Sequence, residues 1–119
     1  MSYELVIFSF FYNRGDKVKE SVKSLIDSCP EKAKIILVND GSTDNTLMEL
    51  KKFESNELVE IVNQNNMGFT NSLVHIINEK INRYSPTYIA IHGAGDICFP
   101  DKVKKQLKYM SENKDVIAL

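Results

Sequence analysis

The chain has 119 residues, of which 43% are hydrophobic and 26% are charged, and its formal net charge is −1. This composition fits one globular domain with one core. The near-neutral charge favours neither nucleic acid nor an anionic membrane surface as a partner. No apolar run reaches the length of a membrane span, and the two cysteines are far apart without metal-type spacing. We therefore expect a reduced, cytoplasmic protein with no transmembrane segment and no nucleic-acid partner.

Apolar runs and amphipathic stretches alternate along the chain. The pattern predicts strands over Leu5–Phe11, Lys34–Asn39, Leu58–Asn63 and Tyr88–His92, helices over Lys17–Cys29, Asp44–Glu54, Phe69–Asn82 and Asp101–Ser111, and the start of a fifth strand at Val116–Leu119. Repeated units of this kind indicate an α/β fold with a doubly wound, mainly parallel sheet and helices on both faces. Residues 1–119 are expected to form a single domain, either cut from a longer protein or closed by a short final strand.

The most informative stretch is an apolar run that leads directly into a polar turn. Ile35–Val38 is followed by Asn39-Asp40-Gly41-Ser42, so Asp40 lies at the carboxyl end of a strand that is buried on both faces. Gly41 permits a sharp turn there. Ligands of open α/β sheets bind at these strand ends. Asp40 is therefore a candidate binding residue, and the alternative is a cap on the following helix.

Polar clusters also follow the other predicted strands, and a parallel sheet brings them to one edge. Tyr12–Gly15 follows the first strand and Asn65–Gly68 follows the third. An aromatic ring beside a carboxylate suits a nucleobase, with Tyr12 stacking on the base and Asp40 accepting a base N–H. An ordinary half-buried tyrosine is the alternative interpretation.

The cluster after the fourth predicted strand reads His92-Gly93-Ala94-Gly95-Asp96. Gly93 and Gly95 remove side chains where a bulky ligand would approach the backbone. Asp96 could bind Mg²⁺ or Mn²⁺ through oxygen, or it could cap a turn. His92 is either a further ligand or a core histidine.

Four segments together resemble the amino-terminal, nucleotide-sugar-binding half of a family 2 glycosyltransferase with a GT-A fold. Phe8–Arg14 resembles the first strand of that family, which ends in Pro-x-Tyr-Asn. Ile36–Asp44 resembles its Val-Asp-Asp-Gly-Ser-x-Asp signature, and Asn66–Phe69 resembles its Asn-x-Gly loop. Tyr88–Asp96, followed by Pro100, resembles the strand that ends in Asp-Ala-Asp-Asp and then a proline.

The resemblance implies an inverting glycosyltransferase domain that binds a UDP-sugar and transfers the sugar to a glycan or lipid-linked acceptor in polysaccharide synthesis. It implies a divalent metal, Mn²⁺ or Mg²⁺, and a cytoplasmic place, free or peripheral at the inner face of the membrane. The catalytic base is expected beyond Leu119. The expected nucleotide-sugar-binding residues are Phe11, Tyr12, Asn13, Arg14, Asp40, Gly41, Ser42, Asn66, Gly68, Gly93, Ala94 and Gly95, with Asp96 and His92 as metal ligands.

The sequence departs from the family pattern at several points. Phe10 stands in place of the proline, which we expect to change the local turn and not the pocket. Gly93 and Gly95 stand at both positions of the Asp-x-Asp motif, so metal binding must rest on Asp96, with or without His92, or be weak. A non-catalytic or degenerate nucleotide-sugar-binding module is the alternative function. A missing second half would leave apolar surface that favours self-association.

Overall fold

The computed structural model describes residues 3–97, 105, 108, 109 and 112. Its elements are β1 (Leu5–Phe11), α1 (Gly15–Ser28), β2 (Ala33–Asp40), α2 (Thr46–Lys51), β3 (Val59–Gln64), α3 (Phe69–Tyr84) and β4 (Tyr88–Ile91). All seven elements predicted before residue 92 are present in the predicted order. The predicted strand at 116–119 lies outside the described residues, as does most of the predicted helix at 101–111.

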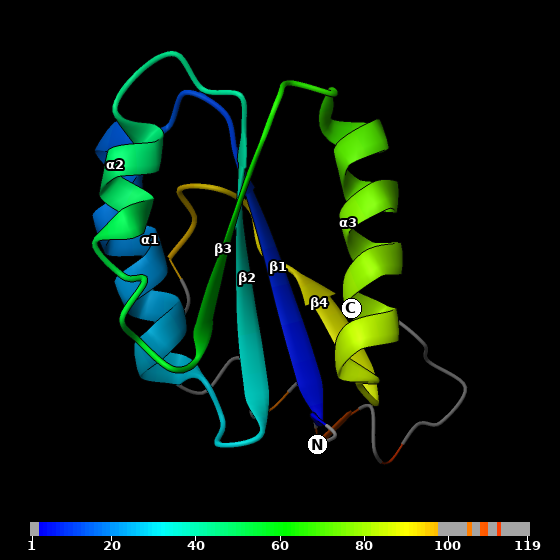
Figure 1. Cartoon of the computed structure of the whole chain (residues 1–119). Coiled ribbons are helices and arrows are strands. Elements are labelled where there is room, and N and C mark those ends of the chain that lie inside the picture. Colours follow the sequence, from blue (N-terminus) through cyan, green and yellow to red (C-terminus); the bar gives the residue numbers. More distant parts are fainter. Residues whose placement is uncertain (1–2, 98–104, 106–107, 110–111, 113–119) are drawn as a thin grey trace.

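The described strands form a parallel sheet in the order β3-β2-β1-β4. Figure 1 shows α1 and α2 on one face of this sheet and α3 on the other. The prediction of a doubly wound α/β fold is therefore confirmed. The registers pair Phe11 with Asn39 and Asp40 with Gln64, so β1, β2 and β3 end together at one edge of the sheet.

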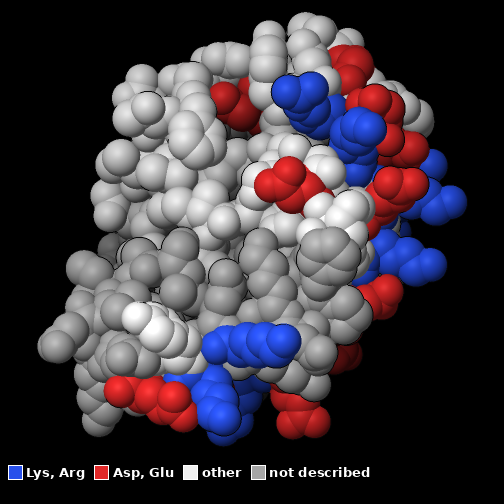
Figure 2. Space-filling view, turned by 180° about the vertical axis from the view of Figure 1, so that it is seen from behind, with Lys and Arg blue, Asp and Glu red and all other residues white. Residues whose placement is uncertain are grey.

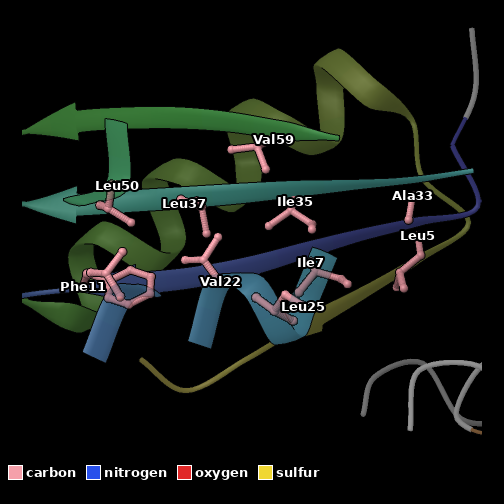
Figure 3. Packing of buried hydrophobic residues seen from close by; sticks show 11 residues of the cluster. Leu5, Ile7, Phe11, Val22, Leu25, Ala33, Ile35, Leu37, Leu50 and Val59 are labelled. Carbon is pink, nitrogen blue, oxygen red and sulfur yellow. The ribbon is translucent and has the colours of Figure 1, made fainter. Parts of the chain in front are cut away.

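β1 is buried along its whole length because both faces of the sheet are covered. Its side chains alternate between two cores. Leu5, Ile7 and Phe11 lie in the core beneath α1 and α2 (Figure 3). Leu50 of α2 is fully buried in the same core, and the α1 residues there are Val18, Val22 and Leu25.

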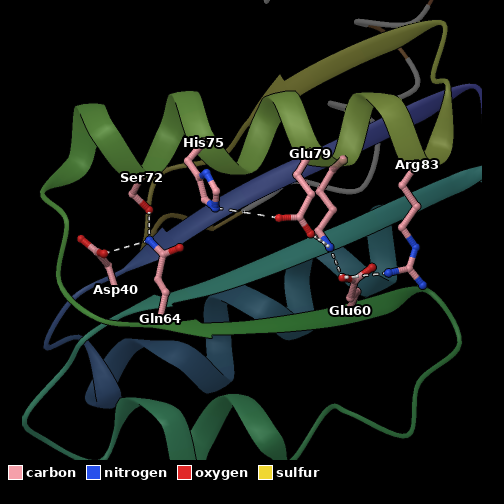
Figure 4. A network of polar contacts seen from close by, with 8 residues as sticks. Asp40, Glu60, Gln64, Ser72, His75, Glu79 and Arg83 are labelled. Atoms are coloured by element: carbon pink, nitrogen blue, oxygen red, sulfur yellow. Dashed lines mark hydrogen bonds and ion pairs between the residues drawn. The ribbon is translucent and has the colours of Figure 1, made fainter.

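The second core lies beneath α3 and contains Val6, Phe8, Phe10, Ile36, Val38, Ile76 and Tyr84. Charged side chains at the edge of this core link α3 to β3 (Figure 4). The ammonium of Lys80, which is 3% exposed, pairs with Glu60, and the Tyr84 hydroxyl donates to the same carboxylate. Burial alone would raise the pKa of Glu60, but the hydrogen bonds from Lys80 and Tyr84, together with the charges of Lys80 and Arg83, outweigh burial and lower it. Burial and the bond to Glu60 raise the pKa of Tyr84 to about 12.

The surface over α1 carries charges of both signs. Figure 2 shows Lys and Arg side chains interspersed with Asp and Glu along the side where α1 lies. Among the described residues, no helix combines the length and apolar character needed to cross a membrane.

Candidate functional site

Asn13 joins the loop after β1 to the polar turn after β2. Its side-chain oxygen accepts hydrogen bonds from the backbone N–H of Thr43 at 2.8 Å and of Asp44 at 3.3 Å. Its own N–H donates to the hydroxyl of Ser42 at 3.0 Å. The backbone of Asn13 is left-handed, with φ 51°, a conformation that asparagine tolerates better than most residues. Asn13 and Ser42 were predicted to bind the nucleotide, and the structure shows that both of them shape the turn.

Asp44 connects the starts of α1 and α2. One carboxylate oxygen accepts from the N–H of Gly15 at 3.2 Å, and the other accepts from the N–H of Thr46 at 2.9 Å and from its hydroxyl. The hydroxyl of Thr46 lowers the pKa of Asp44 most, and the backbone bonds add to the effect against a smaller opposing effect of desolvation. A carboxylate at two helix starts also satisfies N–H groups that lack partners within the helices.

Asp40 is 5% exposed and holds the loop that follows β3. Its Oδ1 accepts hydrogen bonds from Nε2 of Gln64 at 2.9 Å and from the N–H of Met67 at 3.1 Å. The same amide of Gln64 contacts the buried hydroxyl of Ser72 on α3 (Figure 4). Both hydrogen bonds to the carboxylate end on Oδ1, and within the described residues none ends on Oδ2.

Gly41 brings the turn after β2 against the loop that follows β3. Its φ is +69°, and a Cβ there would lie 2.4 Å from the backbone N of Asn66. A side chain at this position would therefore strain the backbone and displace the loop.

A pocket of about 180 Å³ opens beside Asp40. Its wall is largely aromatic, and Tyr12 and Phe69 are 49% and 61% exposed. The rings of Phe10 and Phe69 meet edge to face, with centroids 5.7 Å apart. The lining residues are Phe10, Phe11, Tyr12, Asp40, Asn66, Gly68, Phe69 and Ser72. Flat apolar walls around one carboxylate suit a planar ring with an N–H donor.

The turn after β4 lies beside β1, away from this pocket. His92 is 6% exposed, its carbonyl accepts from the hydroxyl of Ser9 at 3.0 Å, and its Nε2 lies 2.9 Å from the backbone O of Asp96. The N–H of Asp96 donates to the carbonyl of Gly93 at 3.0 Å. Ala94 packs against the core beneath α1. The Nε2–H of His92 therefore closes the turn on the backbone carbonyl of Asp96.

In the structure the predicted site residues lie in the pocket, in the turn that supports it and at the end of β4. Phe11, Tyr12, Asp40, Asn66 and Gly68 line one pocket. Asn13, Gly41 and Ser42 build its supporting turn, and the residues of 92–96 lie at the β4 end. The exposed Arg14 uses its backbone N–H to bind the hydroxyl of Thr46.

The sequence reasoning missed three pocket residues: Phe10, Phe69 and Ser72. The expectation that Phe10 changes only the local turn is wrong, since Phe10 lies within β1 and lines the pocket. Strand alternation was the available signal, because Phe10 shares the α3 face with Val6 and Phe8.

A doubly wound parallel sheet with a pocket at its strand ends defines a Rossmann-like α/β domain. Comparison with known families is more specific. The model of glycosyl transferase family 2 matches residues 7–119. The chain belongs to this family.

Relatives and solved structures agree with the assignment. An uncharacterized glycosyltransferase of Haemophilus influenzae is 34% identical over 110 residues, which are 91% of this chain and 33% of that protein. A poly-beta-1,6-N-acetyl-D-glucosamine synthase of Staphylococcus aureus is 32% identical over 103 residues, 86% of this chain and 23% of the synthase. The chain thus spans about a third or less of the length of these two relatives.

Two solved glycosyltransferases share the fold at low identity. S. aureus TarS 1-349 in complex with UDP has a TM-score of 0.76 and 18% identity, covering 96% of this chain and 33% of TarS. The mannosyltransferase PcManGT from Pyrobaculum calidifontis, in complex with GDP-Man and Mn²⁺, has a TM-score of 0.77 and 15% identity, covering 95% and 34%. These likenesses place the chain in the GT-A fold.

Proposed function

We propose that the chain is the donor-binding part of an inverting glycosyltransferase that uses a UDP-sugar and transfers the sugar to a glycan or lipid-linked acceptor. The observation that carries the proposal is the aromatic pocket with the Asp40 carboxylate in its wall. Family membership supports sugar transfer. The UDP and UDP-GlcNAc complexes of TarS support the choice of nucleotide, and the synthase relative supports a polysaccharide product.

The base is read by Asp40 and Tyr12 in this proposal. Uracil carries one ring N–H donor, at N3, and Oδ2 of Asp40 would accept it. The two hydrogen bonds on Oδ1 fix the carboxylate before the ligand arrives, so little orientational freedom is lost on binding. The half-exposed ring of Tyr12 would stack on the base.

The remainder of the donor lies outside the pocket. Pockets for whole drug-sized ligands enclose about 300–1,000 Å³, so the 180 Å³ beside Asp40 suits the base alone. The ribose and diphosphate would cross the end of β1 toward Gly93, Ala94 and Gly95 at the end of the neighbouring β4. If a divalent metal accompanies the diphosphate, Asp96 is the carboxylate of this turn that would contact it.

A comparison of two nucleotides tests the base-reading step. We expect UDP to raise the melting temperature of the full chain, because a ligand that binds only the native state stabilises it. UDP methylated at N3 has the same shape and charge elsewhere but lacks the donor, and should give little or no shift. Equal shifts from both nucleotides would refute the role of Asp40.

A non-catalytic nucleotide-sugar-binding module is the second candidate. Glycine at both Asp-x-Asp positions favours it, since those carboxylates would otherwise handle the diphosphate. Release of UDP from UDP-sugars in the presence of glycan acceptors separates the two functions. Binding without release by the full-length protein would establish the module, and acceptor-dependent release would establish the transferase.

A further inference from the structure

We propose that this domain binds the donor diphosphate without a divalent cation, and that the ammonium of Lys17 supplies the positive charge. The inference rests on the proposed function, because it assumes that a nucleoside diphosphate occupies the strand ends. It concerns the β4 side of the site, beyond the pocket that reads the base.

The turn after β4 is a poor metal site. Glycine at 93 and 95 supplies no side-chain ligand, and Nε2 of His92 already lies against the backbone O of Asp96. A Cβ on Gly93 would lie 2.4 Å from Oδ2 of Asp96, so the one remaining carboxylate occupies the space of a second. The described part of the chain contains no cluster of three or more His, Cys, Asp or Glu side chains that could hold a metal ion. Divalent cations are normally held by several oxygen ligands.

The side chain of Lys17 lies against the turn at Gly95. A Cβ on Gly95 would be 3.3 Å from both Cβ and Cγ of Lys17, so the lysine stem packs over the bare backbone of the turn. Gly95 has a φ of +88°, a conformation that disfavours a side chain. Lys17 is exposed, and no ion pair involving it is recorded among the described residues. Its ammonium is therefore available to a ligand.

The sheet order sets the distance between the base and the turn against which Lys17 packs. Neighbouring strands are about 4.8 Å apart, so β2, which carries Asp40, lies about 10 Å from β4 with β1 between them. A base at β2 would direct its diphosphate toward β4, and α1 begins immediately after β1. A lysine ammonium binds phosphate as a point charge without a metal.

Calorimetric titration of the full chain with uridine and with UDP separates the two ends of the site. In EDTA we expect UDP to bind about tenfold more tightly than uridine, the effect of one charge-assisted phosphate contact. Mn²⁺ should change the UDP affinity by less than about threefold. Lys17→Ala should weaken UDP binding about tenfold and leave uridine binding unchanged. The control is Lys19→Ala, which removes the same charge from the same helix at a position facing Glu49 and Phe53.

The results of these titrations distinguish a failure of the inference from a failure of the proposed function. If UDP binds more tightly than uridine only when Mn²⁺ is present, or if Lys17→Ala and Lys19→Ala behave alike, the inference is overturned while the base pocket stands. If uridine itself does not bind, the proposed function fails first. A UDP affinity in EDTA that falls with rising ionic strength for the native chain, and much less for Lys17→Ala, supports the lysine.

Discussion

Replacing Asp40 by asparagine tests whether the carboxylate is a ligand-binding group or only part of the loop support. In Asp40→Asn the amide oxygen can take the place of Oδ1 and accept from Gln64 and Met67 as the carboxylate does. The amide nitrogen then takes the place of Oδ2 and presents a donor to the pocket. A uracil N3–H would meet another N–H instead of an acceptor.

The expected changes in stability and in uridine affinity follow from the hydrogen bonds that each substitution alters. Asp40→Asn turns two charge-assisted hydrogen bonds into neutral ones and should lower the free energy of unfolding by about 1 kcal/mol. Asp40→Ala leaves the partner groups on Gln64 and Met67 without an acceptor and should cost about 2–4 kcal/mol. For uridine, losing a bond to a charged acceptor is worth about 1.5–3 kcal/mol, or about 10- to 150-fold in affinity.

Urea denaturation and calorimetric titration of the same samples provide the two measurements. We expect Asp40→Asn to be nearly as stable as the native chain but to bind uridine far more weakly. Native-like uridine binding by Asp40→Asn would show that the carboxylate only supports the loop. A stability loss as large as that of Asp40→Ala would show that the amide cannot reproduce the bonds on Oδ1.

Three further predictions concern the scaffold. Leu50→Ala should lower the free energy of unfolding by about 3 kcal/mol, whereas the exposed Met48→Ala should change it by less than about 0.5 kcal/mol; equal losses in urea denaturation would contradict the assigned core. Glu60→Gln should cost about 1–2 kcal/mol at pH 7, less than a fully buried pair because Glu60 is 21% exposed. The pKa of Glu60 is lower in the folded state than that of an ordinary glutamate, so its contribution is complete above the ordinary glutamate pKa, and the variant and native curves should converge as acid protonates it; a gap that persists in acid would refute the pairing. Asn13→Ala should cost about 1–2 kcal/mol by removing the acceptor for two backbone N–H groups, and an unchanged urea midpoint would show that the turn holds without it.

The fold could be predicted because the strongest signals are local. Apolar runs flanked by turns identify the strands, and the parallel arrangement follows from the intervening helices. Helix ends were less accurate because periodicity does not show which group caps the first N–H groups of a helix. α1 begins at Gly15 and not at Lys17, since the N–H of Gly15 bonds to Asp44, 29 residues away. α2 begins at Thr46 and not at Asp44, since Asp44 accepts the N–H of Thr46 from outside the helix, and it ends at Lys51, before the predicted end at Glu54.

The sequence predicted the residues of the candidate site that follow the strands better than it predicted the aromatic residues that line the pocket. The placement of Asp40 follows from the strand before it, whatever the tertiary contacts. Phe69 is different, because its role depends on α3 packing across the sheet against Phe10. β1 is buried on both faces, so its composition alone does not show which of its residues line the pocket.

The two ends of the proposed site, the pocket beside Asp40 and the turn after β4, differ in how firmly their ligand-facing groups are held in place. At the base end, Asn13 fixes the turn and two hydrogen bonds fix the carboxylate of Asp40. Such preorganisation lowers the entropic cost of binding. At the β4 end, the turn closes on itself through His92 and Asp96 and presents bare backbone at Gly95. Affinity should therefore be concentrated in the base, with the diphosphate adding a salt-sensitive increment through Lys17. A domain built in this way would discriminate among nucleotides by their bases more sharply than by the number of their phosphates.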